Sequence, residues 1–267
     1  MVNGFFQGGE SLNLHLHSRA VTLGNGSEVV LKSVQSLHSG YCCDQSVMDA
    51  MLYLFAARDL QLCEAHTQVN EKLRGYVRRE RSQFLSSEIS GVLFDGTASM
   101  ESILQHPILV EIINLKSFIT FYRTVIPYFW SSKNEWVLTI IDTVTSSVHF
   151  LHPFYDLSIS ALITSDERHA LNLFLKDRIA SILQTTTGLD YLPGKWTFHM
   201  GIEENGRVTV INGVRTVVHN MKDSGLYVLY AMECDYFDTP IFAPDPVHWS
   251  NFRTRMAYCL LNKQLLF

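Results

Sequence analysis

Apolar residues recur at helical spacing in several stretches of the chain, and most of these stretches open at a residue that caps helices well. The predicted helices cover residues 44–55, 65–80, 100–118, 164–186, 223–234 and 246–262. Asp44 marks the first start, and the pair Thr164 and Glu167 forms a capping box at another. Pro107 interrupts the helix that contains it, and Asp245-Pro246 opens the last one.

Between these helices, alternating or β-branched segments predict strands. The predicted strands cover residues 12–17, 29–31, 92–95, 121–127, 135–142, 148–153, 197–203 and 207–212. Asn25-Gly26 and Asn205-Gly206 are typical of tight hairpin turns, and a polar turn at 143–146 joins two further strands. The chain has no internal repeat or linker-like tract, so we expect an α+β fold with a β-hairpin extension over 1–34 and one domain over 35–267.

Composition and net charge argue against some classes of function. The chain has 267 residues, 47% of them hydrophobic, and a net charge of -5, which gives no global attraction to nucleic acid or to an anionic membrane. The one dense basic run, Arg74, Arg78, Arg79 and Arg81, is typical of a solvated helix face. No segment resembles a signal peptide or a membrane span, so we expect an intracellular protein of the nucleus or cytosol.

The cysteines and histidines do not predict a metal centre. Five cysteines stand without C-x-x-C spacing, which favours a reducing compartment over a disulfide framework or a zinc site. His15 and His17 share one side of a predicted strand but have no third ligand nearby. We therefore expect neither a metal nor a cofactor.

The segment from His219 to Leu229 is a polar turn that runs directly into an apolar helix. Asp223 is placed to cap that helix, which puts Ser224 where the free N–H groups and the positive end of the helix dipole point. Acyl-transfer enzymes place a nucleophile at such a junction, because the same dipole stabilises a developing anion. An ordinary capped helix with a serine in its first turn is the alternative interpretation.

Four segments, taken in order, resemble one family. Residues 37–48 share Leu37 and Gly40 with the pattern L-x-x-G-x-W-L-x-D-x-x-I and have Cys42 at the tryptophan position, and 125–127 match a strand that ends in Ile-Pro. Residues 135–142 follow H-W-x-L-x-x-I-D, and 218–225 follow Q-x-N-x-x-D-C-G at the head of a helix. Over roughly 35–262 the chain thus resembles the papain-like SUMO proteases, the Ulp and sentrin-specific proteases. The resemblance implies a Ulp-type α+β fold, with a central mixed or antiparallel sheet flanked by helices.

The departures from this family fall on its catalytic positions. Where the resemblance implies histidine, aspartate and cysteine, this chain has Glu135, His152 and Ser224, and Val218 replaces the glutamine that helps to bind the oxyanion. The imidazole and the carboxylate have exchanged places, so Glu135 faces the serine and is a poor base for a hydroxyl group. A Glu135–His152 ion pair is the expected result.

Two classes of function follow. The first is an inactive pseudoprotease that binds a protein, either a ubiquitin-like modifier or subunits of a larger complex, through a former cleft with binding positions at Trp136, His219, Asn220 and Asp223. The second is an active deSUMOylase- or deubiquitinase-like hydrolase with a rearranged site.

Rearrangement requires new partners for Ser224. The candidate residues are His149, His152 and His219 as the base and Asp156 as the acid. A Cys-to-Ser change made to trap a substrate explains Ser224 but not the three other replacements. A coincidental match to another α+β domain is the remaining alternative.

Overall fold

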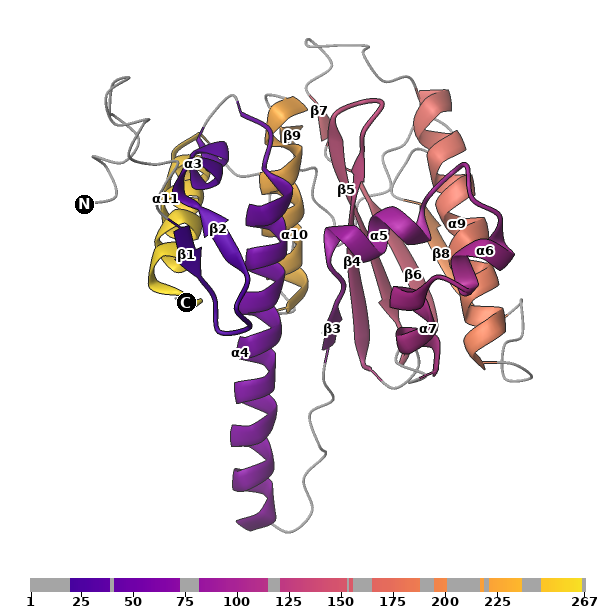
Figure 1. Ribbon diagram of the computed structural model, residues 1–267, viewed down its shortest axis with the longest axis horizontal. Helices are drawn as coiled ribbons and strands as arrows, with labels where there is room; N and C mark the ends of the chain where they lie inside the picture. Colours follow the sequence, from indigo (N-terminus) through magenta and orange to yellow (C-terminus); the bar gives the residue numbers. More distant parts are fainter. Residues whose placement is uncertain are drawn as a thin grey trace.

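The computed structural model of the chain describes residues 20–38, 41–72, 82–114, 121–152, 154–155, 165–187, 195–200, 217–218, 221–236 and 246–265. These residues form three layers, with a central sheet between two groups of helices (Figure 1). The α+β class expected from the sequence is confirmed.

The central sheet has five strands in the order β3-β4-β5-β6-β8. Their bounds are β3 Ser82–Phe84, β4 Arg123–Trp130, β5 Glu135–Asp142, β6 Ser147–Leu151 and β8 Thr197–Met200. The three middle strands are antiparallel, as hairpins require, whereas each edge strand runs parallel to its neighbour. The sheet is therefore mixed, which was one of the two arrangements expected.

All eight residues of β5 are buried, because both faces of this central strand are covered. Trp136 and Leu138 point into the core that the sheet shares with α4 (Gln45–Lys72), α10 (Ser224–Tyr236) and α11 (Pro246–Asn262). Val137 and Ile141 alternate with them and point into a second core, on the opposite face. A single strand thus joins two hydrophobic cores.

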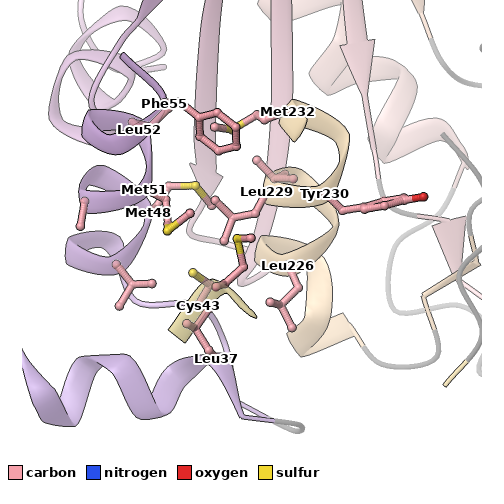
Figure 2. Packing of buried hydrophobic residues seen from close by; sticks show 14 of the residues in the cluster. Leu37, Cys43, Met48, Met51, Leu52, Phe55, Leu226, Leu229, Tyr230 and Met232 are labelled. Atoms are coloured by element: carbon pink, nitrogen blue, oxygen red, sulfur yellow. The ribbon is translucent and has the colours of Figure 1, made fainter. Parts of the chain in front are cut away.

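The first core is built chiefly between α4 and α10. Side chains of the two helices interdigitate there, among them Met48 and Met51 from α4 and Leu229 from α10 (Figure 2). Tyr230 points away from α4 in the same view. Its ring packs against that of Trp249 on α11, with centroids 5.7 Å apart. The helix that carries Ser224 therefore packs against α4 and the sheet, and it contacts α11 through Tyr230.

Four helices cover the opposite face of the sheet, and Figure 1 shows them on the far side from α4. They are α5 Ser87–Leu93, α6 Met100–Leu104, α7 Pro107–Asn114 and α9 Ser165–Thr187. The break predicted near Pro107 is confirmed, since α6 ends at Leu104 and α7 begins at the proline. Arg178 of α9 ties this layer together by donating to the carbonyls of Asp95 and Ala98, at 2.8 Å each.

A small hairpin lies beside the first core. Strands β1 (Ala20–Thr22) and β2 (Glu28–Val30) pair around Gly26, whose φ of 82° explains the glycine in the Asn-Gly turn. Short helices α3 (Leu31–Val34) and η1 (Gln35–Leu37) then lead to α4. Val21 and Val29 of the hairpin belong to the same core as α4 and α10. The boundary at residue 34 stays a prediction.

Two predicted elements are wrong. The chain does not start a second helix at residue 65, because α4 runs unbroken from Gln45 to Lys72 through a stretch without glycine or proline. The segment 92–95 is not a strand: it is the end of α5 and the residues after it. Ser86 caps α5 by accepting from the N–H of Ile89 at 3.3 Å, a start signal that the apolar run obscured.

The third predicted hairpin is found only in part. Strand β8 occupies 197–200 and pairs with β6 rather than within a hairpin, while the turn at Asn205-Gly206 and the strand over 207–212 lie outside the described residues. Residues 12–17, with His15 and His17, also lie outside them. Within the described part of the chain, no helix is long and apolar enough to cross a bilayer, and no three potential metal ligands gather.

Candidate functional site

The head of α10 is held by one arginine. A short helix, η5 (Met221–Asp223), leads into α10, and Ser224 is the first residue of α10. Asp223 lies within 2.8 Å of the guanidinium of Arg253, on α11, and the same guanidinium donates to the carbonyl of Leu37 at 3.0 Å. Arg253 therefore fixes the loop before Ser224 to α11 and to the segment that precedes α4.

Replacing Arg253 by alanine is expected to lower the free energy of unfolding by about 2 kcal/mol, because the nearly buried Asp223 carboxylate loses its counter-charge. Arg255→Ala is the matched control on the same helix, since the side chain of Arg255 is 34% exposed against 11% for Arg253, so its ion pair with Glu233 is more screened by solvent. Urea unfolding of both variants measures the difference. An Arg253→Ala loss no larger than that of the control would contradict this role.

Ser224 lies against the first strand residues of β5. Its hydroxyl oxygen accepts a hydrogen bond from the backbone N–H of Trp136 at 3.0 Å, and the side chain is buried, with 1% exposed. This N–H belongs to the peptide that joins Glu135 to Trp136, so Ser224 lies directly beside Glu135 along the backbone. The structure thus brings two of the three family positions together.

Glu135 and His152 are both buried, with 0% and 1% exposed. Leu138 of β5 pairs with Leu151 of β6, and Glu135 and His152 each lie an odd number of residues from that pair. Alternation along strands therefore places both on one face of the sheet, as diagonal neighbours roughly 7–8 Å apart at their Cα atoms. The expected order, in which His152 stands behind Glu135 rather than beside the serine, stays a prediction.

A second, two-stranded sheet joins the end of β6 to the start of α10. Strand β7 (Phe154–Tyr155) follows His152 and pairs in parallel with β9 (Val217–Val218), with Tyr155 opposite Val218. The short pair lies near the end of α10 where Ser224 begins the helix (Figure 1). The segments carrying all four departures from the family pattern therefore converge at one end of the central sheet.

Trp136 does not form an aromatic surface. Its ring is completely buried, and its indole N–H donates to the carbonyl of Cys43 at 2.9 Å. It also packs against Phe129, with ring centroids 5.1 Å apart. The sequence led us to expect this tryptophan at an open cleft, and we correct that expectation: in the structure Trp136 fixes the segment before α4 to β5.

The two cysteines next to this site differ in their environments. Cys43 is buried, and the burial raises the pKa of its thiol well above the ordinary range, so it is inert as a nucleophile. Cys42 is half-exposed and its sulfur accepts a hydrogen bond from the side-chain amide of Asn134 at 2.9 Å. Asn134 has a φ of 55° at the turn into β5, which suits asparagine.

Of the alternative bases for Ser224, the structure excludes His149. It pairs with Ile140, four residues along β5 from the Trp136 N–H that Ser224 contacts, which is about 13 Å of strand. Its Nε2 instead lies 2.9 Å from the hydroxyl of Ser147. His219, Asn220 and Asp156 lie outside the described residues, so their predicted roles stay predictions.

Sequence reasoning missed two residues that shape the site. In the sequence, Arg253 is one of several charged residues of a predicted amphipathic helix, and its position in that helix does not predict its ion pair with Asp223. Gly225 was noted only as part of a motif, yet a Cβ atom there would lie 2.2 Å from Cys43 Cβ and 3.0 Å from Trp136 Cδ1. The glycine motif after Ser224 was the available signal for this close approach.

Comparison with known proteins gives a fold and no closer relationship. The chain matches no protein-family model and no curated protein sequence. It is similar in structure to the Ulp1-like SUMO protease catalytic domain of Chaetomium thermophilum, with a TM-score of 0.62, 14% identity, and coverage of 97% of this chain and 91% of that one.

Two further solved structures are similar. The yeast Ulp1 protease domain in complex with Smt3 gives a TM-score of 0.59 at 12% identity, over 96% of this chain and 95% of that one. A de-sumoylating protease gives 0.59 at 13% identity, over 94% and 93%. The Ulp-type fold that the sequence resemblance implied is thereby confirmed for nearly the whole chain.

Proposed function

We propose that this protein is a catalytically inactive protein-binding module built on the SUMO-protease fold. One observation carries the proposal: Ser224 occupies the head of α10 at the nucleophile position, but it is buried, its oxygen accepts from the Trp136 N–H, and its backbone neighbour is Glu135. The residue type needed to take a proton from the serine is missing at the position beside it.

The chemistry of these residue types supports inactivity. A glutamate carboxyl group has an ordinary pKa near 4.3, and the pKa of a serine hydroxyl lies many units higher. The carboxylate is therefore a weak base toward that hydroxyl. In Ser-His-Asp sites the imidazole stands between nucleophile and carboxylate, and here His152 comes after Glu135 instead. Val218 brings no hydrogen-bond donor in its side chain, and losing one oxyanion donor costs on the order of a hundredfold in rate.

The proposed partner is a protein, either a ubiquitin-like modifier or subunits of a larger complex. One similar structure is a protease domain bound to Smt3, the yeast ortholog of SUMO, and its fold covers 96% of this chain. A module that keeps this fold without the catalytic residues retains a surface of the same general shape. We place its action in the nucleus or cytosol, where such modifiers are used.

The exposed residue best placed to contact a partner is Tyr41. Its side chain is 60% exposed, its ring makes an edge contact with His38 with centroids 6.1 Å apart, and it lies two residues before Cys43, which meets the head of α10 at Gly225. Large exposed aromatic side chains commonly anchor protein interfaces. Because Trp136 is buried, Tyr41 takes its place in the proposed binding surface.

Tyr41→Ala is expected to weaken binding of a SUMO or ubiquitin-like partner at least tenfold in isothermal titration calorimetry. Tyr258→Ala is the matched control, since Tyr258 is a comparably exposed tyrosine, 45% exposed, on α11. Wild-type protein that binds none of the modifiers tested would argue against this partner class. Equal losses in the two variants would argue against the Tyr41 surface.

The predicted lack of hydrolase activity is tested separately with a ubiquitin-like modifier whose C-terminal glycine carries a fluorogenic leaving group. We expect no turnover above the uncatalysed rate, and no change on Ser224→Ala. Turnover that disappears in Ser224→Ala would establish the hydrolase alternative, because only an attacking hydroxyl makes the rate depend on that atom.

A further inference from the structure

A pair of histidines lies at the edge of the central sheet, away from the Ser224 site. His149 of β6 and His199 of β8 are direct partners in the parallel register, and their rings stack with centroids 4.5 Å apart and planes 12° from parallel. His149 is half-buried, whereas His199 is exposed. Among the described residues β8 has four residues and pairs with β6 alone, so this stack is a side-chain contact that adds to the backbone ladder between the two strands.

The groups around His149 do not compensate a positive charge well. From β5, the Asp142 carboxylate favours protonation, but it also accepts from the N–H groups of Val144 and Thr145 and lies 3.6 Å from the guanidinium of Arg123, on β4. Arg123 and the facing His199 both oppose a charge on His149. On its own strand, His149 has only the neutral hydroxyl of Ser147.

The helical layer adds no carboxylate that is free to face His149 among the described residues. Asp235, at the end of α10, lies 3.3 Å from the guanidinium of Arg123, and its carbonyl accepts from the same group at 2.7 Å. Arg123 thus uses its charge on two carboxylates, one from β5 and one from α10. Burial and like charge together lower the pKa of His149 to about 4.

We propose that the stacked His149–His199 pair is an acid-sensitive latch that holds β8 on the sheet at neutral pH and releases it when both rings become protonated. Two stacked imidazolium rings repel each other at 4.5 Å, whereas two neutral rings, or one of each, stack favourably. Besides its ladder with β6, β8 contacts the second core through Phe198, which lies under the Lys176 ammonium 5.4 Å from its ring centroid.

The direction of the pH effect follows from proton uptake. With β8 released, His149 regains an ordinary pKa near 6.5, so the released state binds more protons than the docked state between pH 6.5 and pH 4. Docking is therefore fully stable above pH 6.5 and weakens as the pH falls toward 4. If the whole difference in the pKa of His149 is coupled to docking, the equilibrium constant for docking of β8 is about 30-fold lower at pH 5 than at pH 7.5.

Hydrogen exchange of the full chain tests the latch. After correction for intrinsic rates, protection of the β8 amides is expected to fall 10- to 30-fold between pH 7.5 and pH 5, while protection of the β5 amides stays within threefold. His149→Gln keeps a hydrogen-bonding side chain next to Ser147 without a titrating group. In that variant the pH dependence of β8 protection should shrink to less than threefold.

Two further variants make the result decisive. His199→Gln removes the facing charge, so the midpoint of β8 release should move to lower pH. His38→Gln, which alters an exposed histidine in edge contact with Tyr41, should leave the midpoint unchanged. A β8 protection that does not depend on pH in the wild type, or a pH dependence that is unchanged in both latch variants, would overturn the proposal.

Discussion

Alanine in place of Gly225 is expected to lower the free energy of unfolding by about 3 kcal/mol or more, a cost at the upper end for an overpacked core. The added Cβ atom would lie 2.2 Å from Cys43 Cβ and 3.0 Å from Trp136 Cδ1. Neither neighbour is the free end of a flexible side chain, so α10 must move away from β5 and from the segment before α4. Urea denaturation followed by circular dichroism measures the loss.

Gly91→Ala is the control for this prediction. Gly91 lies within helix α5, and a Cβ atom there meets nothing within 4 Å, so alanine should be neutral or stabilise by roughly 0.5–1 kcal/mol. Cys43→Gly removes the atom that causes the closest clash, and in the double variant it should recover part of the Gly225→Ala loss. Simple addition of the two single losses would contradict the proposed contact.

Placing the family residues at the four departing positions is expected to produce hydrolysis, which the proposed function does not expect of the wild type. The variant carries Glu135→His, His152→Asp, Ser224→Cys and Val218→Gln together. It regains a base beside the nucleophile, an acid behind the base and an oxyanion donor, so we expect a rate at least about a thousandfold above the wild type with a fluorogenic modifier substrate.

The single change Ser224→Cys is the control, because it supplies a thiol without a base. It should remain at the wild-type rate, since Glu135 cannot play the part of the imidazole. Thermal unfolding must show that the four-position variant is folded, as three of these side chains are almost completely buried. A folded but inactive variant would show that the scaffold has lost more than these residues.

Hydrophobic periodicity predicted most of the fold correctly, and its failures have physical causes. The strands over β4, β5 and β6 were predicted because their apolar and β-branched residues lie between clear turn signals. Helix α4 was divided wrongly because its apolar face fades after Phe55, although its residues still favour helix. The strand predicted at 92–95 was the buried end of a helix whose start, at Ser86, depends on one hydroxyl cap.

The elements of the candidate site were predicted better than its environment. Order along the chain assigned Glu135, His152 and Ser224 to two strands and a helix that the structure brings together, while the roles of the three residues stay predictions. Burial was not predictable, because it depends on the two core layers that close over both faces of β5. Trp136 was therefore taken for a surface residue, although its alternation with Val137 already placed the two residues on opposite faces.

The contact between Ser224 and β5 runs through a main-chain N–H, and every residue except proline at position 136 offers that donor. The location of atom Oγ is consequently independent of which side chains stand at 135 and 152. The main chain therefore fixes residue 224 against β5, whereas the side chains around it can differ. They can serve binding, proton transfer or neither without a change in the position of the backbone.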